Sequence, residues 1–328
     1  MKILIVSGSD VHELLGYGEC AEVLRAALAA RARGEVYQPL RTVIRPGDRA
    51  GLMALMPAYW PGTDPAYGLK AICIFGGNPA IGLDAHQGVV LLSSTRTGEP
   101  LAILNASAIT EIRTAAVSAV ATGLLARPDA TELAIIGTGV QARAHLLAIS
   151  GSRPLTAIRV AGRDHAKAAR FADLMQASAG VPVIACASAR EAVAGAGLIV
   201  TATSAAGPVL QRGWLAAGAH INAVGACLPH TRELDSATMA DAALFADSRE
   251  SVRGEAGDYL LALAEGAIGP GHIRAEIGEL LTGDAAGRSS DQEITVFESL
   301  GLAVEDLAAA AYVYGKASRL GAGVAADF

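Results

Sequence analysis

Long apolar runs are missing from this sequence of 328 residues. No segment reaches the roughly 20 consecutive apolar residues that a membrane-spanning helix needs. At the N-terminus, the apolar run in MKILIVSGSD contains one lysine and stops at Ser7, a pattern that indicates a first β-strand rather than an export signal. We therefore expect a soluble protein of the cytoplasm with no membrane partner.

Cysteine is scarce, and basic charge is not in excess. The four cysteines lie far apart, with no C-x-x-C pair: Cys20, Cys73, Cys186 and Cys227. This spacing argues against a disulfide framework or a zinc site and is typical of reduced thiols, so we expect no bound metal. The 26 Lys and Arg against 32 Asp and Glu give a formal net charge of −6. Because no basic stripe is present, we expect no nucleic-acid partner.

Apolar residues and glycine are plentiful instead. With 52% hydrophobic residues and 37 glycines, the chain is long and apolar enough for one or two domains around sizeable cores. From about residue 130, short apolar runs alternate with mostly Ala-rich segments of helical period; the six runs are ELAIIG, AIRVAG, VPVIAC, LIVTAT, HINAVG and ALFADS. Strands that alternate with helices at this spacing predict an α/β fold with a doubly wound parallel sheet.

The first 110 or so residues follow another pattern. Strand-like runs there are broken by Gly, Pro, Asn and Asp, which is typical of hairpins and a mixed sheet. A helix is predicted over SAITEIRTAAVSAVATGLLAR with Thr110 as its N-cap, which places Arg113 in its first turn. The final stretch SLGLAVEDLAAAAYVYGKASRL predicts one long helix, and its return to the first domain would make that domain discontinuous.

A dinucleotide-binding motif follows the first of the six runs. Gly137, Gly139 and Ala142 form G-x-G-x-x-A directly after a strand and at the start of a helix. The first glycine permits a tight turn, the second lets the backbone approach a pyrophosphate, and the small third residue lets helix and strand pack closely. The helix N-terminus also favours a phosphate. The alternative is a purely structural turn, but the neighbouring strands and helix favour the cofactor.

The end of the second strand indicates which dinucleotide is bound. An NAD site has an acidic residue there for the ribose hydroxyls, whereas this strand ends with Gly162 and Arg163. A guanidinium can bind a 2′-phosphate, so NADP(H) is the preferred cofactor, with NAD(H) possible. Asp164 is one residue further on and is an alternative ribose contact, in which case Arg163 is a solvated surface charge.

Several segments, taken in order, resemble the ornithine cyclodeaminase/mu-crystallin family. They are ITEIRTAAVSAVAT, IIGTGVQARAH, AGAHINAVGACLPHTRELD and ITVFESLGLAVEDLAAA, and upstream QPLRTVI, LMALMPAY and GLKAICIF. The resemblance covers nearly the whole chain, and QPLRTVI and HINAVGA are closer to the mu-crystallin, ketimine-reductase side than to the cyclodeaminases.

The resemblance implies a fold, an assembly and a substrate class. It implies an NAD(P)-binding Rossmann domain of residues 113–302 and a discontinuous α+β domain of residues 1–112 with 303–328 for substrate binding and dimerisation. The expected assembly is a homodimer. Family members act on small α-amino or α-imino acids, and they include cyclodeaminases, alanine dehydrogenases and reductases of cyclic imines.

An imino-acid substrate carries a carboxylate beside a C=N bond, and cations are needed to hold it. The resemblance points to Arg41, Lys70 and Arg113 as catalytic and substrate-binding residues, with Met56 as a substrate contact. Arg113 is expected in the first turn of a helix, where the helix dipole disfavours a cation, and a bound carboxylate would offset this. The alternative is that Arg41 and Arg113 make structural ion pairs with neighbouring acids. Lys70 lies in an apolar strand, where burial lowers its pKa and makes it a proton donor, unless it is an edge-strand lysine facing solvent.

The main departure from the cyclodeaminases is Cys227 in GACLPHTREL. By resemblance, cyclodeaminases carry at this position an Asp that serves ornithine ring closure. A thiol is a poor base unless its pKa is lowered, so ornithine deamination is disfavoured. We expect Cys227 to line the substrate pocket, with a catalytic role as the alternative, and we interpret His230 as a surface-loop residue.

The remaining cofactor contacts come from strand ends and from the resemblance. Thr201 and Thr203 end the fourth strand at the carboxyl edge of the sheet, where ligands bind in such folds. Asn222, Val224 and Gly225 end the next strand beside the expected nicotinamide. By resemblance the contacts also include Thr114, Thr138, Val140, Gln141, Ser299 and Gly301.

The sequence thus predicts a homodimeric NADPH-preferring reductase of small cyclic ketimines that forms L-proline or L-pipecolate. Three alternatives stay open. They are an ornithine cyclodeaminase, an NAD(P)-dependent dehydrogenase of an open-chain amino acid such as alanine, and a non-catalytic protein that binds NADPH with a hydrophobic ligand.

Overall fold

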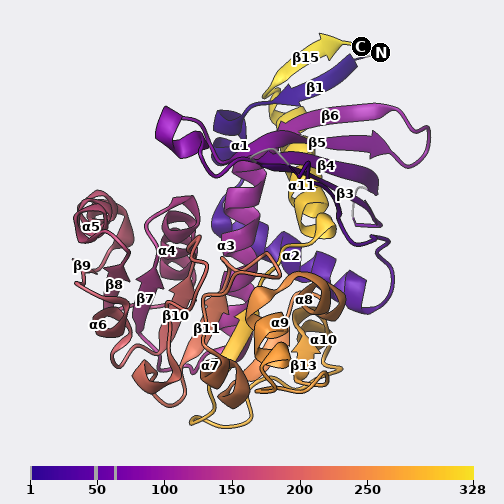
Figure 1. Cartoon of the computed structure of the whole chain (residues 1–328). Helices are drawn as coiled ribbons and strands as arrows, with labels where there is room; N and C mark the ends of the chain where they lie inside the picture. The colour runs from indigo at the N-terminus through magenta and orange to yellow at the C-terminus, as the bar shows by residue number, and fades with distance from the viewer. Residues whose placement is uncertain (1, 48–50, 63–64) are drawn as a thin grey trace. The chain divides into compact units, whose positions relative to one another are not determined.

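The computed structural model describes residues 2–47, 51–62 and 65–328, which form two compact units. Unit 1 comprises Met1–Arg113 with Gly301–Phe328, and unit 2 comprises Thr114–Leu300. Both ends of the chain therefore contribute to unit 1. Figure 1 shows the N-terminal strand β1 (Lys2–Val6) and the C-terminal strand β15 (Val324–Asp327) side by side, in agreement with their antiparallel pairing.

Unit 1 is built on a seven-stranded mixed sheet in the order β15–β1–β6–β5–β4–β3–β2. The pair β1–β6 is parallel and the other pairs are antiparallel, so hairpins dominate, as the broken strand-like runs predict. The further elements are α1 (Gly8–Leu14), α2 (Tyr17–Ala32), β2 (Thr42–Ile44), β3 (Leu52–Trp60), β4 (Ala66–Ile74), η1 (Asn78–Ile81), β5 (His86–Ser94), β6 (Pro100–Asn105) and α11 (Ala303–Leu320).

Alternation along the central strands gives this sheet one buried face and one open face. On the buried face, Met56, Lys70 and Val90 lie opposite one another on β3, β4 and β5. Helix α11 packs against these strands, and a Cβ added to Gly68 would lie 2.5 Å from Leu307 of that helix. Lys70 therefore points inward from a central strand, and the edge-strand alternative is wrong.

The helix that follows β6 begins earlier than the sequence predicts. Helix α3 spans Ala106–Leu125, and the side chain of Asn105 caps it by accepting a hydrogen bond from Ala108 N at 2.9 Å. Thr110 is therefore not the N-cap. Arg113 lies about two turns inside the helix. The prediction that it is an unfavourably placed cation in the first turn is therefore also wrong.

Helix α3 is one helix of the described residues that is long and apolar enough to be tested as a membrane span. By length and composition it qualifies as a candidate span, with a mean hydropathy of 1.3. However, 83% of the qualifying window is buried inside the protein. A core helix that is apolar on all sides passes the same test, so burial in the core explains the composition of α3.

Unit 2 contains an eight-stranded sheet, all parallel, in the order β13–β12–β14–β11–β10–β7–β8–β9. The predicted fold class, a doubly wound sheet beside an α+β part, is confirmed. Besides the larger part of α3, the elements are β7 (Glu132–Ile136), α4 (Val140–Ser152), β8 (Ala157–Ala161), α5 (His165–Ala179), β9 (Val183–Ala185), α6 (Ala189–Val193), β10 (Leu198–Thr201), η2 (Arg212–Trp214), β11 (His220–Ala223), α7 (Ser236–Asp241), β12 (Ala243–Ala246), α8 (Arg249–Glu255), α9 (Gly257–Ala264), β13 (Ile273–Glu276), α10 (Ile277–Thr282) and β14 (Thr295–Glu298).

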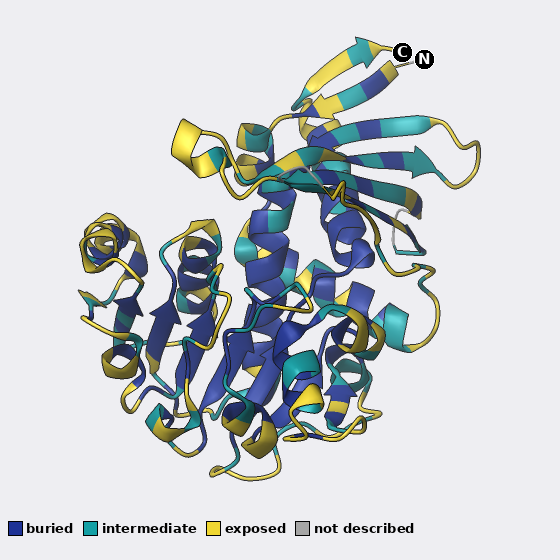
Figure 2. Ribbon diagram, in the orientation of Figure 1, coloured by how far each residue is buried: buried dark blue, intermediate teal, exposed yellow. Residues whose placement is uncertain are grey.

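Two apolar cores cover the two faces of this sheet. In β7, Leu133 and Ile135 face the core made with α4 and α5, whereas Ala134 and Ile136 face the core made with α6 to α9. Figure 2 shows these strands in the colour of buried residues. The sequence predicts only six strands and does not include β13 and β14. In the structure, β14 pairs between β11 and β12 rather than in chain order.

Candidate active site

The loop after β7 has the geometry that a dinucleotide pyrophosphate requires. Gly137 has φ of +132°, and a Cβ there would lie 2.4 Å from the carbonyl oxygen of Ala202, so only glycine fits. Gly139 is the N-cap of α4, and no described side chain caps this helix end or approaches within 4 Å of an added Cβ. The first-turn N–H groups can therefore donate to a phosphate. Ala142 is fully buried against the sheet, as the motif requires.

The end of β8 lies next to this loop. A Cβ added to Gly162 would lie 3.2 Å from the methyl group of Thr138, so the glycine lets the two loops approach each other. Arg163 is exposed. Asp164 is the N-cap of α5 and accepts a hydrogen bond from Lys167 N at 3.1 Å. Asp164 thus has a structural role that the sequence analysis did not assign to it.

The other predicted cofactor residues of unit 2 mostly follow strand ends at the same edge. Thr201 pairs with Ala223, and Ala223 pairs with Glu298, so the residues after β10, β11 and β14 are neighbours. The hydroxyls of Thr114 and Ser299 are buried and have no hydrogen-bond partner among the described residues. Buried polar groups of this kind are typical of a ligand site. This edge brings together Gly137, Thr138, Gly139, Val140, Gln141, Arg163, Asp164, Thr201, Thr203, Val224, Gly225 and Ser299.

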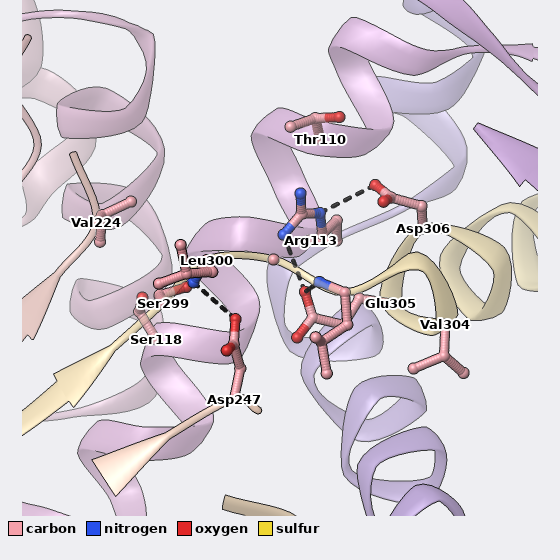
Figure 3. Close-up of polar contacts among 12 residues, drawn as sticks. Thr110, Arg113, Ser118, Val224, Asp247, Ser299, Leu300, Val304, Glu305 and Asp306 are labelled. Carbon is pink, nitrogen blue, oxygen red and sulfur yellow. Dashed lines mark hydrogen bonds and ion pairs between the residues drawn. The ribbon is translucent and has the colours of Figure 1, made fainter. Parts of the chain in front are cut away.

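A second group of functional side chains lies in unit 1. Lys70 Nζ is 2.6 Å from Asp306 Oδ2, and Arg113 Nε is 3.0 Å from Asp306 Oδ1. Arg113 Nη1 is 2.9 Å from Glu305 Oε2, and Figure 3 shows the guanidinium of Arg113 directed at both acids. All four side chains are at most 5% exposed. The structural ion pairs considered for Arg113 are therefore present, and Asp306 bridges the two cations.

Arg41 and Gly301 belong to the same group. Arg41 Nη2 donates to the carbonyl oxygen of Gly301 at 3.0 Å. Gly301 has φ of +80°, and a Cβ there would lie 2.4 Å from Arg113 Nη1. Any side chain at this position would displace the guanidinium. The structure thus places Gly301 with the cations of unit 1, although the resemblance implies a cofactor contact.

Burial and charge together set the protonation of this group. Burial lowers the pKa of Lys70 to about 8, with Arg113 and Arg41 acting in the same direction, while the charge of Asp306 opposes the shift. Burial also raises the pKa of Asp306, but Arg113 and Lys70 outweigh this and hold it below its usual value. Lys70 can therefore exchange a proton near neutral pH. The cations of Lys70, Arg113 and Arg41 thus lie in one group of unit 1, and cations of this kind can bind a carboxylate.

Cys227 and His230 lie in the loop after β11. The thiol of Cys227 is partly buried and donates to the carbonyl oxygen of Val224 at 3.4 Å. His230 is exposed, as predicted for a surface-loop residue.

Glu305 and Asp306, the two acids paired with Lys70 and Arg113, were not predicted from the sequence. Glu305 and Asp306 occupy the first turn of α11, where acidic residues are common because they stabilise the helix dipole. Nothing in their spacing distinguishes them from ordinary capping residues. The sequence shows only that two adjacent acids precede a run of four alanines in a segment of helical period.

The sequence profile of the ornithine cyclodeaminase/mu-crystallin family matches residues 1–320. The chain belongs to this family. Among its relatives, the ketimine reductase mu-crystallin of Mus musculus is 41% identical over 294 residues, which are 89% of this chain and 90% of the mouse protein.

Two solved structures of the family resemble the chain closely. The Δ1-pyrroline-2-carboxylate reductase of Thermococcus litoralis, solved in complex with NADH and L-proline, has a TM-score of 0.95 and 37% identity and covers 98% of this chain and 99% of its own. An archaeal alanine dehydrogenase dimer with bound NAD has a TM-score of 0.94 and 31% identity, with full coverage of both chains. Both structures contain a nicotinamide dinucleotide.

Proposed function

We propose that this chain reduces small cyclic ketimines with NAD(P)H, converting Δ1-pyrroline-2-carboxylate to L-proline and Δ1-piperideine-2-carboxylate to L-pipecolate. The observation that carries the proposal is the buried group of Lys70, Arg113 and Asp306. It places two cationic side chains where a carboxylate can bind, and one of them is a lysine with a pKa of about 8. The similarity to a reductase crystallised with NADH and L-proline supports the same assignment.

The residues of unit 1 have separate tasks in this reaction. Arg113 and Arg41 bind the substrate carboxylate, and Asp306 and Glu305 fix the orientation of the Arg113 guanidinium. Met56, opposite Lys70 on β3, limits the space for the ring. Lys70 donates its proton to the imine nitrogen, or to a water that reaches it. Because these side chains are buried, little water screens their charges, and each of these electrostatic interactions is stronger than it would be in water.

Unit 2 binds the cofactor. The turn at Gly137 and the N-terminus of α4 hold the pyrophosphate, and Ser299 and Thr114 supply hydroxyl groups. When bound, the nicotinamide supplies a hydride from C4 to the imine carbon. The overall change is imine plus NAD(P)H plus one proton to amine plus NAD(P)⁺.

The test is the loss of 340 nm absorbance when the purified protein meets NADPH or NADH with each cyclic imine. A parallel sample with pyruvate and ammonia tests the alanine dehydrogenase reaction, and one with ornithine and NAD, assayed for ammonia, tests the cyclodeaminase reaction. Rapid oxidation with the cyclic imines alone supports the proposal. Ammonia release from ornithine would contradict it and the interpretation of Cys227.

Cofactor preference rests on Arg163, whose guanidinium we propose binds the 2′-phosphate of NADPH. Replacing Arg163 with alanine is expected to raise the KM for NADPH by about tenfold to a hundredfold, since a charge-assisted contact to phosphate is lost. The KM for NADH should change less than about twofold. Steady-state kinetics with both cofactors measure this. Arg170→Ala, an exposed arginine further along α5, is the matched control, and equal effects on both cofactors would contradict the assignment.

We also propose that the chain forms a homodimer through the open face of the unit 1 sheet. The register places apolar side chains on this face, and several are well exposed: Ile5 at 43%, Ile44 at 50%, Met53 at 36%, Tyr67 at 53% and Val89 at 40%. Exposed apolar side chains gathered on one sheet face are typical of a protein–protein interface. A second copy is the proposed occupant because a protein of similar structure is a dimer.

Replacing Val89 with glutamate is expected to dissociate this dimer. In a two-fold interface each substitution occurs twice, so two buried charges oppose association. The dissociation constant should rise on the order of a hundredfold or more. Light scattering coupled to size-exclusion chromatography gives the mass directly. Leu174→Glu, which adds the same charge at a 70% exposed position of α5, should leave the mass unchanged.

A further inference from the structure

One buried carboxylate in unit 2 holds together two loops at the carboxyl edge of the sheet. Glu233 Oε1 accepts a hydrogen bond from Thr203 N at 2.6 Å, and its Oε2 accepts one from Gly225 N at 2.7 Å. Thr203 follows β10, and Gly225 follows β11. Each loop therefore donates one backbone N–H to one carboxylate oxygen of Glu233.

The position of this carboxylate is itself fixed. Asp258 Oδ1 accepts hydrogen bonds from the backbone N of Glu233 at 2.8 Å and from that of Leu234 at 2.7 Å. The carbonyl oxygen of Glu233 accepts from the amides of Val209 and Leu210. With its backbone held on both sides and its side chain fully buried, Glu233 has little freedom to follow a displaced loop.

The two loops are also packed too closely for another arrangement. A Cβ on Gly225 would lie 2.2 Å from the carbonyl oxygen of Thr203 and 2.6 Å from the Cδ of Glu233. The amides of the two loops can approach one another only because an acceptor lies between them and position 225 has no side chain. A glutamine could accept only one of the two bonds, since its NH₂ group would face the other N–H.

In the described part of the chain, two backbone amides contact the carboxylate of Glu233. Burial raises the pKa of Glu233 above its usual value, and the hydrogen bonds from Thr203 and Gly225 oppose part of this shift. Its neighbours are less suited to carry charge, because burial raises the pKa of Asp258 to about 7 and that of Glu298 well above its usual value. Each oxygen of Glu233 accepts a backbone N–H, and this hydrogen-bond geometry is the one that a carboxylate anion adopts.

We propose that Glu233 is a positioning residue that sets the spacing of the loops after β10 and β11 for the nicotinamide half of the cofactor. In doubly wound sheets, ligands bind at this edge, outside the carboxyl ends of the strands. Glu233 does not contact the cofactor; it acts through the backbone of Thr203 and Gly225. The proposal rests on the proposed function, since it presupposes that unit 2 binds NAD(P)H.

The experiment compares Glu233→Gln and Glu233→Asp with wild-type protein by hydrogen exchange and by NADH binding. Without cofactor, peptides containing the amides of Thr203 and Gly225 should exchange about tenfold or more faster in both variants, because aspartate is one methylene too short to reach both loops. The Kd for NADH, from its fluorescence, and the KM for NADH should rise by about tenfold to a hundredfold. The KM for the imine should change less than about twofold.

Tyr259→Phe is the matched control for general destabilisation. It removes the partly buried hydrogen bond from the Tyr259 hydroxyl to the carbonyl oxygen of Pro270 in the same unit, a bond in which neither Thr203 nor Gly225 takes part. This variant should lower the melting temperature without changing exchange in the two loops or the Kd for NADH. The aspartate variant keeps the buried charge, so it serves if Glu233→Gln does not fold.

The outcomes separate the two proposals. Unchanged loop exchange or an unchanged Kd for NADH in the Glu233 variants, with a wild-type protein that binds NADH, overturns the role of Glu233 alone. A wild-type protein that does not bind NADH or NADPH overturns the proposed function and this inference with it.

Discussion

Replacement of Lys70 with methionine is expected to lower kcat/KM for the cyclic imines by about a hundredfold to ten-thousandfold. Methionine keeps most of the volume of the side chain on the buried face of β4 but removes the proton donor and one of the three cations beside the substrate carboxylate. The Kd for NADH should stay within about twofold, because Lys70 belongs to unit 1 and the cofactor residues belong to unit 2. Steady-state assays and NADH fluorescence measure the two quantities.

Two further variants separate chemistry from folding. In Lys70→Met, Asp306 keeps its ion pair with Arg113 but loses the one with Lys70, and removal of one partner from a buried pair costs about 3–5 kcal/mol of stability. The double variant Lys70→Met with Asp306→Asn should recover part of the melting temperature without recovering activity. Lys316→Met, at a lysine paired with Glu19 near the surface, is the control. A loss of less than about tenfold in Lys70→Met would rule out Lys70 as the proton donor.

Replacement of Asp306 with asparagine is expected to move the alkaline limb of the pH profile to lower pH. In wild-type protein the protonated form of Lys70 is present below a pKa of about 8 and is lost as the pH rises through this value, so kcat/KM should fall above pH 8. The charge of Asp306 raises the pKa of Lys70. Its removal should therefore shift the limb downward by roughly 1–3 pH units. Profiles of kcat/KM against pH for both proteins measure the shift.

Titration of the substrate is common to both proteins, so the difference between their profiles reports on the lysine. Glu305→Gln is the matched control: Glu305 contacts Arg113 at 2.9 Å, whereas the pKa of Lys70 depends on Asp306. It should raise the KM for the imine but leave the limb in place. If Asp306→Asn does not fold, Lys70→Arg tests whether the limb belongs to Lys70, because a guanidinium stays charged and the residual activity should show no limb near pH 8. Coincident limbs in Asp306→Asn and wild type would contradict the role of Asp306.

The cofactor-binding turn follows from the sequence because its determinants are local. Gly137 needs a positive φ and close approach to a neighbouring strand, Gly139 opens a helix, and Ala142 packs beneath it, all within six residues. The alternation of short apolar runs and helices likewise predicts the doubly wound sheet. Lys70 is recognisable as buried because the apolar residues around it lie in one strand.

Contacts between distant segments were beyond the sequence. Asp306 meets Lys70 across the packing of α11 on β4, and Glu233 meets Thr203 and Gly225 across the edge of another sheet. Periodicity tells which face of an element is apolar, but it does not tell which acid will lie opposite which cation. For the same reason, the sequence did not predict that the short strand β14 pairs between β11 and β12, out of chain order.

The N-cap of α3 was predicted wrongly because two residues near its start are suitable caps. Both Asn105 and Thr110 are good helix caps, and only the end of β6 at Asn105 decides in favour of the first. Because α3 begins at Ala106, Arg113 lies in its interior rather than in its first turn, and it contacts Glu305 and Asp306. The sequence by itself therefore determined the fold class, the family and the cofactor turn, because local backbone geometry and apolar periodicity encode them. Only the tertiary structure decided how the buried charges are paired, because that depends on which helices pack on which strands.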